Sequence, residues 1–375
     1  MVLDERAKKL AEIVINYSVK ITSSDKVSIG GEQAYEEFAR GIGRVAELRG
    51  AKVVYDLSNP TRIRDLIRNG SALDLITERD SKLKTLEGCT ARIGIDASED
   101  PDFFKDVDPK KIAEYSRVVS KPYSDIVCGD GKSHKGLKWN IVAYPSEREA
   151  RKAGMSLEDY TDFLFGATNI DWETTKKEMQ RIKDLFDGAQ EVHILVPGQT
   201  DLRLSLTGRK GQICAGTFNM PDGEVFYGPI ENSAEGHITF PYKSSRGGQE
   251  VEGIRLVYKD GLIVKHSARS NQEFLEAMLD LKGVRRIGEL GIGCNFGIKR
   301  YTQNLLFDEK IGGTVHIAIG ESYFEGLDNG GGLNEGEIHW DLVCDLRKIN
   351  GLPGGELYVS NRLVQKAGIW CFEGI

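Results

Sequence analysis

The sequence of 375 residues is poor in cysteine and contains no long apolar run. Its six cysteines form no Cys-x-x-Cys pair and lie mostly among apolar neighbours, which predicts buried free thiols rather than disulfides or a zinc knuckle. No stretch approaches the roughly 20 apolar residues of a membrane helix. The N-terminus is charged from Asp4 to Arg6 and lacks the apolar core of a signal peptide. We therefore expect a cytoplasmic protein that has no membrane partner.

Long basic runs and two common hydrolase motifs are missing as well. No run of lysine or arginine is longer than a pair, and the net charge of −7 argues against a nucleic-acid binder. The sequence has neither His-Glu-x-x-His nor Gly-x-Ser-x-Gly, which excludes the zincin and α/β-hydrolase classes. The hydrophobic share of 40% and the charged share of 29% are those of an ordinary globular protein.

The two halves of the chain differ in their sequence patterns, and the chain is longer than a usual domain with a single hydrophobic core. In the first half, short β-prone runs alternate with helical patterns, which predicts an α/β domain with a largely parallel sheet. Beyond Gly188, short β-prone runs alternate with Gly, Pro and Asn turns. We expect an α/β domain over residues 1–188 and a β-rich α+β domain over residues 189–375. The predicted strands of the first domain are Lys26–Gly31, Ala51–Leu57, Ala91–Asp96 and Trp139–Pro145.

The stretch from Thr314 to Cys344 places polar groups in apolar, β-prone surroundings. It holds His316 and His339, two of only six histidines in the chain. His339 and Asp341 are two residues apart, so on a strand both side chains leave the same face. Such a pair makes half of a metal site. A core histidine that is merely oriented by a neighbouring carboxylate shows the same pattern, and more commonly. In either case a buried ionisable group needs a partner or a metal.

Two glutamates lie in similarly unusual surroundings. Glu224 follows a turn and enters an aromatic strand, and Glu289 stands alone in an apolar, glycine-rich segment. Together with His316, His339 and Asp341 they offer oxygen and nitrogen donors without a thiolate. This donor set suits zinc, cobalt, manganese or iron. Three carboxylates can also bridge two metal ions, which in such pairs lie about 3.5–4 Å apart.

At these residues the sequence resembles the aminopeptidase T/aminopeptidase S group of metallopeptidases. The resemblance runs over most of the chain and is strongest from Gly198 to Asp341. It rests on short segments whose order and spacing are specific in combination. The segments are Gly198–Leu202, Asn219–Phe226, Gly288 with Glu289, Leu306–Glu309, His316–Gly320 with Tyr323, and Ile338–Asp341.

The resemblance implies a metallo-aminopeptidase that uses two divalent metal ions. Zinc and cobalt are the first choices for these ions, and manganese and iron come second. The resemblance further implies an N-terminal α/β domain, a catalytic, metal-binding C-terminal domain, and a homodimer that encloses the active sites. The substrates would be short peptides. Carried over position by position, the metal ligands would be Glu224, Glu289, His316, Tyr323, His339 and Asp341.

The implied reaction removes N-terminal residues with an activated water molecule. Two ions would share the water and lower its pKa towards neutrality, and one of them would also bind the free α-amine of the peptide. Tyr323 would be a ligand or would stabilise the oxyanion. Glu289 would be a bridging ligand or the general base. Tyr323 and Glu289 are therefore the candidate catalytic residues.

The sequence departs from the better-known members of this group in two places. Lys310 follows Leu306–Glu309 where those enzymes usually carry Asn-Ala, and Gly291–Gly297 replaces the residues that usually follow the Gly-Glu pair. Both features resemble a divergent branch related to dihydroxypyridine ring-cleaving dioxygenases. The alternative function is therefore a mononuclear Fe(II) dioxygenase that acts on a small hydroxylated aromatic such as a dihydroxypyridine. A binding protein with a vestigial site is a third interpretation, which the complete ligand set disfavours.

Overall fold

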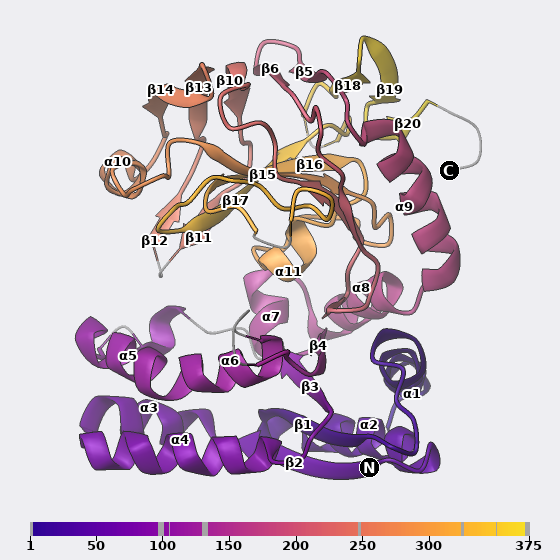
Figure 1. Ribbon diagram of the computed structural model, residues 1–375, viewed down its shortest axis with the longest axis vertical. Coiled ribbons are helices and arrows are strands. Elements are labelled where there is room, and N and C mark those ends of the chain that lie inside the picture. Colours follow the sequence, from indigo (N-terminus) through magenta and orange to yellow (C-terminus); the bar gives the residue numbers. More distant parts are fainter. Residues whose placement is uncertain are drawn as a thin grey trace. The chain divides into compact units, whose positions relative to one another are not determined.

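The computed structural model divides the chain into two compact units (Figure 1). The described residues are 3–96, 101–104, 106–129, 134–246, 249–323, 326–349 and 351–371. The first unit, here called the α/β unit, comprises Met1–Arg151, Met155–Asn169 and Gly216–Pro221. The second, the β-rich unit, comprises Lys152–Gly154, Ile170–Ala215 and Asp222–Ile375. The chain therefore passes between the units more than once.

The α/β unit is built on a five-stranded sheet. In order across the sheet, the strands are β2 (Lys52–Ser58), β1 (Lys26–Glu32), β3 (Ala91–Asp96), β4 (Lys138–Ala143) and β8 (Asn219–Met220). All neighbouring pairs are parallel, which confirms the predicted parallel sheet. The central strands bury Ile29 and Ile93 completely. The edge strand β8 comes from much later in the chain than the other four.

Several helices of the α/β unit begin at a residue whose side chain caps them, among them α1, α3, α4, α5 and α8. Asn59 caps α3 by accepting a hydrogen bond from the Thr61 N–H, and Pro60 occupies the first helical position. Ser71 and Asp74 form a capping box at the start of α4. In the described part of this unit the α-helices are α1 (Glu5–Ile13), α2 (Glu36–Leu48), α3 (Pro60–Asn69), α4 (Ala72–Leu86), α5 (Pro109–Tyr115), α6 (Lys121–Cys128), α7 (Glu147–Lys152, which ends at the unit boundary) and α8 (Leu157–Thr168).

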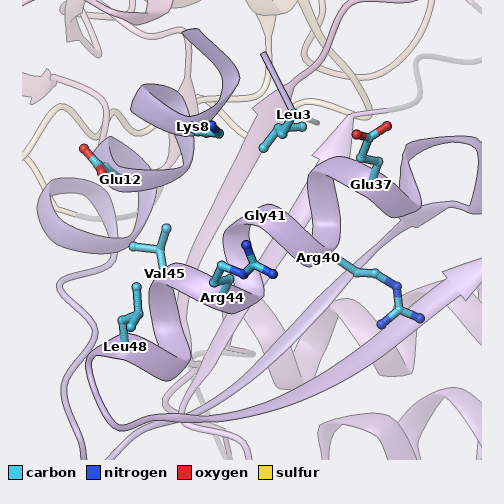
Figure 2. A pocket seen from close by; sticks show the side chains of 9 residues that line it. All are labelled: Leu3, Lys8, Glu12, Glu37, Arg40, Gly41, Arg44, Val45 and Leu48. Carbon is cyan, nitrogen blue, oxygen red and sulfur yellow. The ribbon is translucent and has the colours of Figure 1, made fainter. Parts of the chain in front are cut away.

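A cavity of about 490 Å³ lies between α1 and α2 (Figure 2). Lys8 and Glu12 line it from α1, and Arg44 lines it from α2. Leu3 lies against Gly41, where a Cβ would come within 2.6 Å of Leu3 Cδ2. The lining contains neither histidine nor cysteine, so this cavity does not provide the donor set that the sequence predicts for the metal site.

The β-rich unit contains two antiparallel sheets and a hairpin, as Figure 1 shows. The larger sheet has the order β14 (Leu262–Ser267), β13 (Arg255–Lys259), β10 (Glu235–Thr239), β6 (Thr200–Leu204), β5 (Val192–Val196), β18 (Glu356–Val359), β19 (Arg362–Lys366) and β20 (Ile369–Trp370). The smaller sheet has the order β17 (His339–Asp345), β16 (Thr314–Gly320), β15 (Ile287–Gly293), β9 (Glu224–Tyr227) and β7 (Gln212–Cys214). The hairpin joins β11 (Ser244–Arg246) and β12 (Gln249–Val251). The described α-helices are α9 (Trp172–Phe186), α10 (Gln272–Leu279) and α11 (Leu305–Asp308).

Strands β15 and β16 form the centre of the smaller sheet, and every residue of both strands is buried. Their glycine, valine and isoleucine content explains this burial, because such runs pack on both faces of a sheet. Glu289 of β15 and His316 of β16 are therefore removed from water. Buried groups of this kind require partners.

Two further predictions concern cysteine and membranes. All six cysteines are free thiols, of which Cys128 and Cys371 are exposed and the other four are buried. Within the described residues, no helix combines the length and the apolar character that a membrane crossing requires.

Candidate metal centre

Five of the predicted site residues lie on one face of the smaller sheet. Every second residue of a strand shares a face, and strand pairing aligns these positions across the sheet. Gly291 pairs with His316, and Gly293 pairs with Glu224. Ala318 pairs with Glu289 on one side and with Asp341 on the other. The face therefore carries Glu224, Glu289, His316, His339 and Asp341.

Small residues on this face leave room for the polar groups. The His316 ring lies against Gly291, where a Cβ would come within 1.9 Å of ring atoms Cε1 and Nε2. A register shift between Ile287 and Glu289 marks a β-bulge in β15, and a bulge re-aims the side chains next to it. The backbone of the sheet thus sets the positions of Glu289 and His316.

The five side chains form two clusters that share Glu289. The inner cluster consists of Glu224, Glu289 and His316, and the outer cluster consists of Glu289, His339 and Asp341. In the inner cluster, His316 Nε2 lies 3.0 Å from Glu289 Oε1 and 3.5 Å from Glu224 Oε2. In the outer cluster, His339 Nε2 lies 3.2 Å from Asp341 Oδ1 and 3.9 Å from Glu289 Oε2. The two oxygens of Glu289 therefore face different histidines.

Each histidine is held by a backbone carbonyl at its other ring nitrogen. Nδ1 of His316 lies 2.9 Å from the carbonyl oxygen of Glu309, and Nδ1 of His339 lies 2.7 Å from that of Glu321. A proton on Nδ1 is donated to this carbonyl, which orients the ring and directs Nε2 at the carboxylates. Metal-binding histidines are commonly held in this way.

Two carboxylate oxygens in the centre lack hydrogen bonds. Oε2 of Glu224 and Oε2 of Glu289 are buried and accept none from the described residues. Burial of a charged oxygen without a donor is costly, and a cation between the clusters would remove this cost. The site fits a divalent metal ion for three reasons. Two of its carboxylate oxygens lack a hydrogen-bond donor, its donor atoms are oxygen and nitrogen, and both histidine rings are oriented towards the carboxylates.

The charged groups of the centre shift one another's pKa values. Burial lowers the pKa of His316, but the hydrogen bond with Glu289 and the charge of Glu224 raise it to about 9. Burial also lowers the pKa of His339, whereas Asp341 raises it to about 10. Burial raises the pKa of both glutamates, and the charge of His339 overcomes burial to lower the pKa of Asp341 to about 2. Without a metal, protons on the imidazoles balance the carboxylates.

Tyr323, the remaining predicted residue, follows β16 and borders the outer cluster. Its ring centroid lies 4.9 Å from that of His339 and 5.3 Å from that of Phe226. The residue is 43% exposed, unlike the buried residues of the inner cluster. A glycine-rich segment packs behind it, since the Gly332 N–H donates to the Tyr323 carbonyl at 3.0 Å. The phenol therefore lies where a molecule from solvent can reach it.

Lys310 belongs to the centre, although the sequence pattern did not place it there. Its side chain is completely buried, its Nζ lies 3.7 Å from Glu224 Oε1, and it forms an ion pair with Glu309. Burial lowers the pKa of Lys310, but the charges of Glu224 and Glu309 overcome this and raise it. In the sequence, the only indication that Lys310 is special was that the aminopeptidase group usually carries different residues after the segment Leu306–Glu309.

Two other features near the metal centre could not be predicted from the sequence. Arg246 of β11 donates from Nη1 to the carbonyl oxygen of His339 at 2.6 Å. Cys214, Asp222 and Glu224 form a third, fully buried cluster. Burial raises the pKa of the Cys214 thiol well above its usual range, whereas the thiolate is the form that binds metals. The third cluster therefore fits a metal less well than the inner and outer clusters.

The chain is similar over almost its whole length to one family of known proteins. The family model described as thermophilic metalloprotease (M29) matches residues 3–370. Aminopeptidase 2 of Geobacillus stearothermophilus is 24% identical to this chain over an alignment of 416 residues, gaps included. The alignment covers 99% of this chain and 98% of that protein.

Two solved structures share the fold. Wild-type AmpT from Thermus thermophilus matches with a TM-score of 0.79 and 22% identity, over 98% of this chain and 99% of that chain. The 2,5-dihydroxypyridine dioxygenase from Pseudomonas putida KT2440 matches with a TM-score of 0.59 and 14% identity, over 100% of this chain and 99% of that chain. At these identities both likenesses show the fold alone.

Proposed function

Because the chain belongs to the thermophilic metalloprotease family M29 and is a metallo-aminopeptidase, we propose that it removes N-terminal residues from short peptides with a water activated by two divalent ions. The observation that carries this proposal is the position of Glu289. One of its oxygens faces His316 of the inner cluster, and the other faces His339 of the outer cluster. A carboxylate between two sets of donors is the arrangement of a bridging ligand.

The inner cluster would hold one ion and the outer cluster the other. Zinc and cobalt suit these donors best, and manganese or iron would also be accepted. The chemistry supplied at these donors would be a lowered pKa of a shared water and polarisation of the scissile carbonyl. Tyr323 would complete the set of six ligands or act on the substrate directly.

The side chains of the chain itself would position the reactants. The Glu309 and Glu321 carbonyls hold the two histidine rings in place, so little reorganisation accompanies the reaction. Glu289 lies 3.0 Å from His316 Nε2 and 3.9 Å from His339 Nε2, and it would bridge the centre or accept the proton of the attacking water. Tyr323, which is accessible, would stabilise the oxyanion of the tetrahedral intermediate by donating a hydrogen bond to it. The free α-amine of the peptide would bind at the same centre, which accounts for the removal of N-terminal residues.

The ring-cleaving dioxygenase is not favoured. Its support is a shared fold at 14% identity, whereas the family model and the curated relatives are peptidases. A cytoplasmic location and a homodimer stay proposals. Light scattering of the purified full chain tests the dimer, and fractionation of cells that produce it tests the location.

Metal-loaded protein tests the main proposal. The chain is stripped with a chelator, reloaded with zinc or cobalt, and assayed on aminoacyl-anilides and on peptides of two to ten residues. We expect two ions per chain, hydrolysis of the shorter peptides, and no hydrolysis when the α-amine is acetylated. At most one ion per fully loaded chain, with no hydrolysis, would contradict the proposal. Turnover of 2,5-dihydroxypyridine with Fe(II) and oxygen would instead support the dioxygenase.

A further inference from the structure

We propose that Lys310 makes the two metal positions unequal, so that the outer cluster fills first and the inner cluster binds its ion more weakly. This inference rests on the proposed two-ion centre and concerns the order in which it is loaded. Lys310 would be a positioning residue that acts through Glu224. It would not contact the substrate.

The ammonium group of Lys310 is confined beside the inner cluster. Its side chain has no exposed surface, and its Nζ lies 3.7 Å from Glu224 Oε1. The backbone is fixed at both ends, because the Lys310 N–H donates to the Phe307 carbonyl and the Lys310 carbonyl accepts from the Asn295 N–H. The ammonium therefore cannot withdraw into solvent when a cation approaches Glu224.

The same neighbourhood also orients the inner histidine. Lys310 forms an ion pair with Glu309, whose carbonyl oxygen lies 2.9 Å from His316 Nδ1. Glu224 is thus shared between the lysine and any ion held with His316. A divalent ion at this position must compete with an ammonium for one carboxylate and is repelled by it, and water screens such a buried pair of cations poorly.

Among the residues that the structure describes, no lysine or arginine forms an ion pair with a carboxylate of the outer cluster. Within the described residues, the ion pairs of Lys310 are with Glu224 and Glu309, whereas its charge acts on Asp341 only from beyond ion-pair distance. The guanidinium of Arg246 donates to the backbone carbonyl of His339, and it interacts with the charge of Asp341 without forming an ion pair with it. The outer cluster therefore attracts a divalent ion more strongly.

Metal titration of four proteins tests the inference. Cobalt or zinc is added to the stripped full chain in a calorimeter, and bound metal is counted by elemental analysis. The variants are Lys310→Met, which removes the charge, Lys310→Arg, which keeps it, and Lys366→Met as control. Lys366 is an exposed lysine that pairs with Glu356 at 2.8 Å in the same unit.

The wild-type chain should bind two ions in steps whose affinities differ by about tenfold or more. Lys310→Met should tighten the weaker step by about tenfold or more and leave the stronger step unchanged. Lys310→Arg and Lys366→Met should keep the unequal steps. A weaker step that Lys310→Met leaves unchanged or weakens further would overturn the inference, because Lys310 would then be neutral or helpful to metal binding.

A second variant keeps the test decisive if Lys310→Met does not fold. Glu309→Gln removes a counter-charge of the lysine but keeps the backbone carbonyl that faces His316. It should weaken the second step further, and a tightened second step would overturn the inference. Two equal steps in the wild-type chain would overturn the role of Lys310 but leave the two-ion function intact. Absence of metal binding in every protein, with no hydrolysis, would overturn both.

Discussion

The contact between Gly291 and His316 leads to a prediction about a residue that carries no functional group. In Gly291→Ala, the new Cβ would lie 1.9 Å from Cε1 and Nε2 of the imidazole. Ordinary contact begins at 3.4 Å, so the ring must retreat by about 1.5 Å. His316 Nε2 now lies 3.0 Å from Glu289 Oε1, and a displacement of this size removes the ring from hydrogen-bonding and ligand distance.

The magnitude follows from the precision that such a centre requires. A misplacement of about 1 Å can lower a rate by about 10²-fold, which corresponds to about 2.7 kcal/mol of transition-state stabilisation. Overpacking a core costs about 1–3 kcal/mol of stability. We therefore expect Gly291→Ala to fold with a lowered melting temperature, to bind the inner ion weakly, and to lose about 10²-fold in kcat/KM.

The assay compares kcat/KM on an aminoacyl-anilide, bound metal and thermal unfolding for wild type, Gly291→Ala and Gly166→Ala. Gly166 lies in α8, and a Cβ there would meet no atom within 4 Å, so this variant should keep full activity. Alanine is normally better than glycine in a strand by about 0.5–1 kcal/mol. A Gly291→Ala protein that is fully active and more stable than wild type would therefore refute the steric argument.

Three other predictions concern the proposed ligands. Glu289→Gln should lose affinity for both ions and at least about 10²-fold in kcat, because both clusters share this carboxylate, whereas unchanged metal content and activity would favour a vestigial site. Tyr323→Phe should lower kcat by about 10²-fold at unchanged metal content, while loss of an ion would make the phenol a ligand. His316 and His339, with pKa values of about 9 and 10, are protonated near pH 7 in the stripped protein. Metal binding should therefore release a proton from each and tighten as the pH rises through this range, and calorimetry in buffers of different ionisation enthalpy will measure the release.

The strands of the site could be predicted because their signals are local. The run from Thr314 to Gly320 is apolar apart from His316 and is fully buried in the structure. His339 and Asp341 do lie on one strand, with Nε2 and Oδ1 3.2 Å apart. The alternation of helices and strands before residue 145 was also sufficient to predict the parallel sheet, which the strand pairing confirms.

Features that depend on pairing between distant strands could not be predicted. The packing of the His316 ring against Gly291 could not be predicted, because this contact depends on the register of β15 against β16. The return of Asn219 and Met220 to the edge of the parallel sheet involves only two pairs of residues, too few for a sequence pattern. Arg246 meets His339 through a backbone carbonyl, for which no side-chain motif exists.

Lys310 shows most clearly why composition alone misjudges this centre. Following Asp308 and Glu309, it has the appearance of a solvated charge on the surface, yet it is completely buried. Burial of a lysine is tolerated because Glu224 and Glu309 surround it. The same two carboxylates would otherwise need positive charge from protonated histidines or from metal ions. The histidines can release their protons to an incoming ion, whereas the lysine stays charged beside its carboxylates. Lys310 therefore supplies, permanently and within the fold, part of the positive charge that a second ion would bring.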